Sequence, residues 1–217
     1  MNELTLIQKV VVWSLPVLFA ITVHEVAHGW VARRLGDPTA MMMGRLTLNP
    51  LKHIDPIGTV VVPIVLLLLG GFIFGWAKPV PVTWRNLRNP KRDMALVALA
   101  GPISNLLMAL FWAALAKIGL MIVATTPFIG MPLFYMGGAG IFINVALMVL
   151  NLLPLPPLDG GRVASGLLPG PWAYKFDRLE PYGFFILLGL MATGILSAIM
   201  NPPLLALLNL IHGLFGI

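Results

Sequence analysis

Long apolar runs separated by short polar stretches dominate the chain, and they predict helices that cross a membrane. The runs lie at about 5–32, 94–123, 133–153 and 181–199. Several approach or exceed the ~20 residues that a spanning helix needs, and the bilayer core offers no water to the backbone, so such segments must be helical. A last apolar piece, 203–217, follows Asn201-Pro202-Pro203, which we expect to interrupt the helix before it. Its roughly 13 apolar residues are short for a span.

Two polar stretches enclose a less regular apolar segment at 57–74. In the first, residues 44–50 alternate like a short strand. In the second, proline at alternate positions, Pro79 and Pro81, predicts extended backbone that forms at most an edge strand. We therefore expect an all-α polytopic membrane protein with about 4–5 transmembrane helices, a re-entrant segment and short membrane-associated strands.

The few charges indicate on which side the loops lie. With 14 Lys and Arg against 8 Asp and Glu, the net charge is +6, and basic residues gather at 33–52 and 78–92. The positive-inside rule puts both regions in the cytoplasm, so we assign the positive charge to topology and expect no nucleic-acid partner. Both flanks of 57–74 then lie on one side, which predicts a re-entrant segment, with an ordinary crossing as the alternative. The absence of cysteine excludes a cysteine metal site.

Three ionisable residues stand inside the first apolar run: His24, Glu25 and His28. Ionisable residues at membrane depth mark candidate functional sites. Four residues apart on a helix, the two histidines project from one face, where they can share a metal ion. The adjacent glutamate can then act as a general base. His24 precedes Arg33 by nine residues, or roughly 13 Å below the cytoplasmic helix end. The alternative is a polar pair packed between helices.

A catalytic zinc site needs a third protein ligand, and Asp159 is the strongest candidate. It follows a proline-rich break at 154–157 and precedes Gly160-Gly161, which permits close backbone approach. Two imidazoles and one carboxylate leave the fourth zinc position to water. We expect His212 to be packed singly on its apolar segment. The other histidine and acids near the basic loops are expected to be solvated: His53, Asp55, Asp93, Asp177 and Glu180.

Three motifs occur in one order: His-Glu-Val-Ala-His at 24–28, Gly-Pro-Ile-Ser-Asn at 101–105, and Asn-Leu-Leu-Pro-Leu-Pro-Pro-Leu-Asp-Gly at 151–160. In this combination the chain resembles the site-2 protease family of intramembrane zinc metalloproteases, over most of 20–165. Gly-Arg-Leu-Thr-Leu-Asn-Pro and Trp-Ala-Lys-Pro-Val-Pro-Val resemble the compact bacterial branch of that family.

The resemblance implies a zinc-dependent endopeptidase that cleaves a peptide bond in or near a transmembrane segment of a membrane-protein substrate. It implies a multi-pass protein of the cell membrane, surrounded by lipid, with its active site toward the cytoplasmic side. We expect a single domain over 1–217, with a catalytic core at about 5–165 and C-terminal helices at about 179–217. The alternative is a membrane metal carrier or metal sensor, although no internal repeat of the transporter kind is evident.

The motifs also imply roles for single residues. His24, His28 and Asp159 are implied to hold one zinc ion, with Glu25 as the catalytic base. Asn151 is implied to steady the substrate carbonyl or oxyanion. The candidates for substrate contact are Asn105, Asn144, Trp76, Pro79 and Val80. For the two asparagines the alternative is packing between helices.

Overall fold

The computed structural model describes residues 4–61 and 78–217, and this part of the chain is built from helices. Four are long and apolar enough to cross a membrane: α1 (Leu6–Arg34), α4 (Pro90–Ile122), α5 (Pro127–Asn151) and α9 (Ile195–Phe215). The shorter elements are α2 (Thr39–Met42), η1 (Pro50–Lys52), η2 (Pro56–Val61), η3 (Trp84–Asn86), α6 (Asp159–Leu167), α7 (Gly170–Asp177) and α8 (Glu180–Ala192). The predicted all-α polytopic membrane fold is confirmed.

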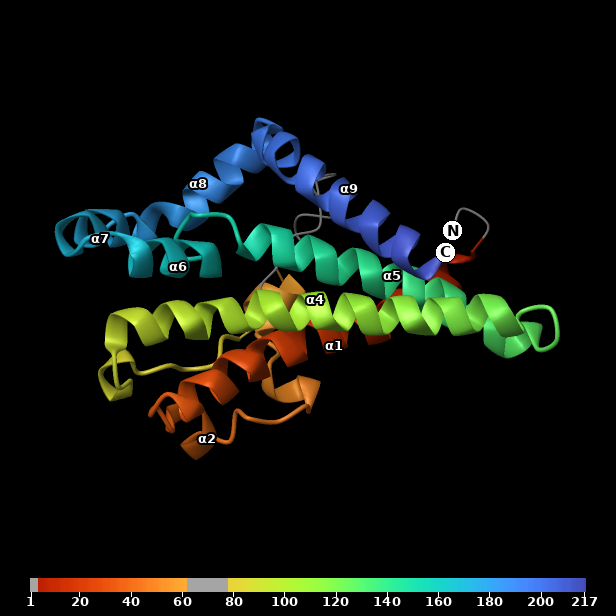
Figure 1. The fold of residues 1–217 in the computed structure, drawn as a ribbon, viewed down its shortest axis with the longest axis horizontal. Coiled ribbons are helices and arrows are strands. Elements are labelled where there is room, and N and C mark those ends of the chain that lie inside the picture. The colour runs from red at the N-terminus through yellow and green to blue at the C-terminus, as the bar shows by residue number, and fades with distance from the viewer. Residues whose placement is uncertain (1–3, 62–77) are drawn as a thin grey trace.

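Helices α1, α4 and α5 lie side by side and run in alternating directions (Figure 1). The end of α1, the start of α4 and the end of α5 therefore share one end of the molecule. Small residues bring the helices close together. A Cβ on Gly140 would lie 2.1 Å from the ring of Trp112, and one on Gly137 would lie 2.5 Å from Ala116. Such close packing is how membrane helices associate without a hydrophobic driving force.

Helix α4 begins at Pro90, a few residues before the predicted start. Proline at the first helical position has the backbone angle of a helix and lacks only an N–H that would have no partner there. The Asp93 carboxylate accepts a hydrogen bond from the Asn89 N–H at 2.8 Å, which stabilises the same end. Asp93 is thus buried at 3% exposure, and its predicted solvation is wrong.

The C-terminal helices divide elsewhere than predicted. The break falls at Gly194, whose φ of +76° suits glycine, and α9 then continues through Asn201-Pro202-Pro203. The expectation that Asn201-Pro202-Pro203 interrupts the helix is wrong. Membrane helices tolerate internal proline because neighbouring groups adjust to the freed carbonyls. As a result, residues 203–215 belong to a 21-residue helix of spanning length.

The strands expected at 44–50 and around Pro79 are absent from the described residues, which contain no β-strand. Proline at 79 and 81 removes the N–H donors along one edge of this segment, so no neighbouring strand can pair along that edge. Single hydrogen bonds hold this extended segment instead, and in one of them the Arg45 side chain donates to the Lys78 carbonyl at 2.7 Å. The Lys78 N–H donates to the His53 carbonyl at 2.9 Å. Most of the expected re-entrant segment, and Trp76, lie outside the described residues.

Asp37 fastens the chain after α1 to the segment that leads into α4. Its carboxylate is fully buried and accepts hydrogen bonds from the Thr39 hydroxyl, from the Thr83 N–H at 2.6 Å and from the Asn86 amide at 2.9 Å. Burial by itself raises the pKa of Asp37, but the hydrogen bonds from Thr39, Asn86 and Thr83 outweigh it and lower the pKa below its ordinary value.

We expect Asp37→Ala to lower the free energy of unfolding by about 3 kcal/mol at pH 7, because buried donors lose a charged acceptor. A lowered pKa in the folded state stabilises fully above the ordinary value of about 4 and is lost as the pH falls below it. The difference between wild type and variant should therefore shrink in acid. Thermal unfolding of wild type and variant in detergent, at pH 7 and at a pH below about 4, measures this difference in stability. The exposed Asp177→Ala is the control, and an equal loss there would contradict the assignment.

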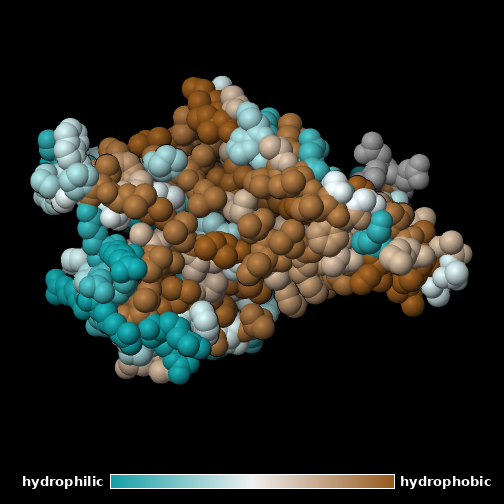
Figure 2. Space-filling model, in the orientation of Figure 1, coloured by the Kyte–Doolittle hydropathy of each residue, from teal (hydrophilic) through white to brown (hydrophobic). Residues whose placement is uncertain are grey.

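The surface is apolar over the middle of the molecule, while hydrophilic side chains gather along the lower left edge in Figure 2. In Figure 1 this is the region of α2 and the start of α4. Arg33 and Arg34 in the last turn of α1 contribute to the same end. The hydrophilic side chains thus gather at one end of the helices, while apolar side chains cover their middle (Figure 2).

Candidate metal centre

His24 and His28 face one point from successive turns of α1. Their Nε2 atoms are 3.0 Å apart, and the ring planes cross at 87°. Both rings lie well inside the molecule, at 8% and 9% exposure. The helix continues through both residues because apolar residues with ordinary helical geometry surround them.

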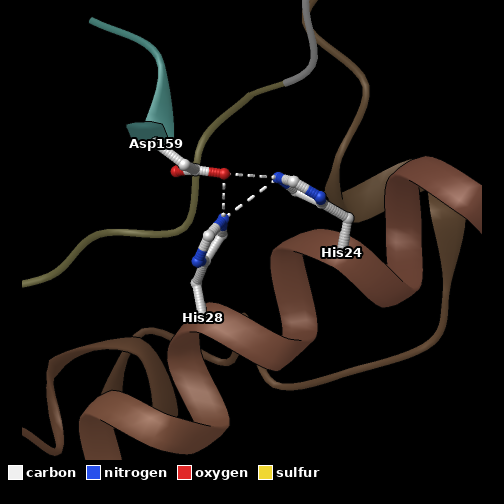
Figure 3. Close-up of side chains that lie close together, drawn as sticks. All are labelled: His24, His28 and Asp159. Atoms are coloured by element: carbon white, nitrogen blue, oxygen red, sulfur yellow. Dashed lines mark hydrogen bonds and ion pairs between the residues drawn. The ribbon is translucent and has the colours of Figure 1, made fainter. Parts of the chain in front are cut away.

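Asp159 completes the group from another part of the chain. As the first residue of α6, it places Oδ2 3.2 Å from His24 Nε2 and 3.3 Å from His28 Nε2 (Figure 3). Gly160 and Gly161 make this placement possible. A Cβ at Gly160 would lie 2.3 Å from the Leu153 carbonyl oxygen, so a larger residue would push α6 and its carboxylate away.

The arrangement of donor atoms fits a zinc ion. The Nδ1 of His28 donates to the Val97 carbonyl at 2.7 Å, which leaves a lone pair on Nε2. Asp159 Oδ2 is buried without a hydrogen-bond partner. The ligand atoms of all three residues lie within 4.8 Å of one another. Ligands at about 2.0–2.1 Å around a tetrahedral zinc are themselves about 3.3 Å apart. Converging lone pairs at these distances need a cation.

Glu25 stands beside this group, with its carboxylate turned toward the extended segment. Its Oε2 accepts a hydrogen bond from the Val80 N–H at 2.7 Å. Val80 is flanked by Pro79 and Pro81, and Glu25 is half-buried. The contact fixes the carboxylate next to His24 in the chain, while a free oxygen remains to take a proton.

Gly101 makes room for the two imidazoles where α4 passes α1. A Cβ on this residue would lie 2.5 Å from His24 Cε1 and 2.5 Å from His28 Nε2. These distances are shorter than any real Cβ contact, and the obstructed atoms belong to the metal-binding rings. The glycine of the Gly-Pro-Ile-Ser-Asn motif is therefore part of the site's geometry.

We expect Gly101→Ala to weaken zinc binding by about tenfold or more, since overpacking of this kind costs about 1–3 kcal/mol. Titration of the purified protein against a competing chelator measures the zinc affinity. Gly138→Ala is the matched control, because nothing lies within 4 Å of a Cβ there. Equal affinities in the two variants would mean that the rings do not lie against α4.

The other candidate residues lie in different places. Asn105 and Asn144 have no exposed surface and lie behind His24. Asn151 is half-buried at the end of α5, where its amide donates to the Leu147 carbonyl at 3.0 Å. Pro79 and Val80 lie in the extended segment beside Glu25. Their roles toward a substrate stay predictions.

Sequence reasoning missed the supports of the site. Gly101, the Val97 carbonyl and Arg45 were not singled out, although a glycine between apolar residues is a usable signal. His53, expected to be solvated, is 2% exposed, and its Nε2 donates to the Thr47 carbonyl at 2.9 Å. That expectation was wrong because the loop folds back on itself to hold Lys78.

Comparisons with known proteins agree with this donor set. A model of peptidase family M50 matches residues 12–125. "Putative zinc metalloprotease YwhC" of Bacillus subtilis strain 168 is 40% identical over 195 residues, which are 86% of this chain and 83% of that protein. "Putative zinc metalloprotease Rip2" of Mycolicibacterium smegmatis is 32% identical over 182 residues, 83% of this chain and 66% of that protein. No solved structure matches the chain.

Proposed function

Because the chain belongs to peptidase family M50, the site-2 proteases, and is a membrane zinc metalloprotease, we propose that it cleaves membrane-protein substrates in or near a transmembrane segment. The observation that carries this proposal is the convergence of His24, His28 and Asp159 beside Glu25. The histidines lie within a helix long enough to span a membrane, so a substrate must present its peptide bond at that depth.

Each residue of the site has a chemical task. His24, His28 and Asp159 would hold the zinc, which would supply Lewis-acid chemistry at the water and the scissile carbonyl. Glu25 takes the proton of the attacking water and later delivers it to the leaving amine. Asn151 donates to the developing oxyanion. Its amide is directed at Leu147 in the structure, so this task requires a rotation of the side chain.

The substrate must be unwound to expose its amides, and the extended segment at 78–82 is the proposed holder. Backbone pairing with an extended segment is a common way to bind peptides. Pro79 and Val80, with Trp76 before them, are the proposed contacts. Arg33 and Arg34 at this end of α1 support a cytoplasmic position for it by the positive-inside rule, and we propose that the active site faces the cytoplasmic side.

Cleavage of a single-span membrane substrate by the purified protein in detergent tests the proposal. We expect one defined cut, its loss after treatment with a zinc chelator, and its return when zinc is added. Mass spectrometry of the fragments locates the cut relative to the transmembrane segment. A cut confined to soluble regions would contradict intramembrane specificity. Metal movement across vesicles without any cleavage would instead favour a metal carrier.

A further inference from the structure

Two asparagines on neighbouring helices hold the ring of His24 from behind. His24 Nδ1 lies 2.6 Å from Asn105 Oδ1 on α4, and Asn105 Nδ2 donates to Asn144 Oδ1 on α5 at 3.0 Å. Both asparagines are fully buried, at 0% exposure, so their hydrogen-bond partners are groups of the protein itself. The hydrogen bonds thus run from the metal-facing ring of α1 across α4 to α5.

Backbone carbonyls at two points fix the direction of every hydrogen bond in this row. Asn144 Nδ2 donates to the Gly140 carbonyl at 2.8 Å, so its Oδ1 must face Asn105. Asn105 Nδ2 donates to that oxygen and to the Ala20 carbonyl at 3.3 Å. Turning the Asn105 amide over would bring its oxygen against two acceptors. Asn105 Oδ1 therefore faces His24, and only a hydrogen on Nδ1 can satisfy it.

We propose that Asn105, supported by Asn144, is a positioning residue that fixes His24 in the tautomer with its hydrogen on Nδ1. The lone pair of Nε2 is then always directed at the metal. The hydrogen bond made by one ring nitrogen determines what the other nitrogen can bind, and such partners commonly contribute 10–100-fold to metal affinity. This inference rests on the zinc site of the proposed function.

His28 reaches the same state by a different route. Its Nδ1 donates to the Val97 carbonyl at 2.7 Å, a backbone group that belongs to every sequence. His24 has no such carbonyl at Nδ1 and depends on a side chain. The Gly-Pro-Ile-Ser-Asn motif therefore supplies both the space for the rings, through Gly101, and the partner of one of them, through Asn105.

The competing explanation is that the two asparagines only bind helices together, as buried amides do in membranes. The two roles predict different results. If they only hold helices together, replacing either residue should lower stability similarly and leave the zinc affinity of the folded protein unchanged. If Asn105 positions His24, replacing Asn105 should weaken zinc binding much more than replacing Asn144. Without Asn144, the Ala20 carbonyl still accepts from the Asn105 amide and orients it.

The tautomer can be measured directly on wild-type, metal-free protein. In ¹⁵N-histidine-labelled protein the two nitrogens of a neutral imidazole give separate signals, and the chain has only 4 histidines to assign. We expect the hydrogen of His24 on Nδ1, with the His24→Gln spectrum identifying its signals. A hydrogen on Nε2, or a mixture of both tautomers, would overturn the proposal. This result is independent of proteolysis, and the tautomer itself is read from the wild-type protein.

Zinc affinity of folded variants provides the second test. We expect Asn105→Leu to raise the zinc Kd by about 10–100-fold, and Asn144→Leu to raise it by about threefold, less than Asn105→Leu. Asn209→Leu, at an exposed position of α9, should not change it. Kd comes from chelator competition on protein whose thermal unfolding shows that it is folded. A Kd within about twofold of wild type for Asn105→Leu would refute the positioning role.

Discussion

Replacing Glu25 by glutamine is expected to abolish peptide cleavage while zinc binding and the fold stay intact. A glutamine cannot take a proton from water at neutral pH, and loss of a general base commonly costs about 10²–10⁴-fold in rate. Its side-chain oxygen can still accept the hydrogen bond that Glu25 receives from the Val80 N–H at 2.7 Å, so the extended segment should stay in place. Fragment yield over time and zinc per chain by mass spectrometry measure the two effects.

Glu180→Gln is the matched control for this experiment. Glu180 is exposed at the start of α8, outside the group of converging ligands, so its replacement should leave cleavage unchanged. Cleavage by Glu25→Gln at more than about a tenth of the wild-type rate would rule out Glu25 as the base, given the size of base catalysis.

Asp159→Ala is expected to reduce bound zinc from about one ion per chain to a small fraction of that after dialysis. The change removes one of the three proposed protein ligands and leaves only the two imidazoles. The side chain also joins the start of α6 to α1, because its Oδ2 lies 3.2–3.3 Å from both histidines. Metal analysis of the purified variant measures the loss, and cleavage should fall with it.

Asp177→Ala controls for the loss of a carboxylate as such. Asp177 is exposed in the last turn of α7 and belongs to no ligand group among the described residues. If Asp159→Ala retains its zinc, Asp159 is not a ligand. The third donor would then have to come from a residue outside those brought together in Figure 3.

The sequence was sufficient for features that depend on local pattern. Apolar runs of spanning length predicted α1, α4 and α5, because a helix is the backbone conformation that lipid allows. The spacing of His24 and His28 predicted one shared face, because it follows from helical geometry alone. The structure also brings Asp159 to these histidines, although more than a hundred residues separate them in the chain.

The features that could not be predicted depend on contacts between distant segments. Nothing near Gly101 in the sequence says that two imidazoles will lie against it. The sequence shows that His53 and Asp93 are polar residues near loops, which predicts solvation. It does not show their hydrogen-bond partners, because the Thr47 carbonyl and the Asn89 N–H are backbone groups that every residue type carries. The continuation of α9 through Pro202-Pro203 depends likewise on surroundings that proline propensity does not describe.

The segment beside Glu25 has one further consequence. Pro79 and Pro81 have no N–H, so Val80 carries the single amide hydrogen among these three residues, and Glu25 accepts it. One hydrogen bonds strongly to one acceptor at a time. If the substrate binds as proposed, with a carbonyl paired to Val80, that carbonyl would displace the Glu25 oxygen, which could then attract water while a peptide is in place. Without a peptide, the same hydrogen bond holds one of the two carboxylate oxygens at Val80, so in this binding mode the arrival of the chain to be cut would free the second oxygen of the base.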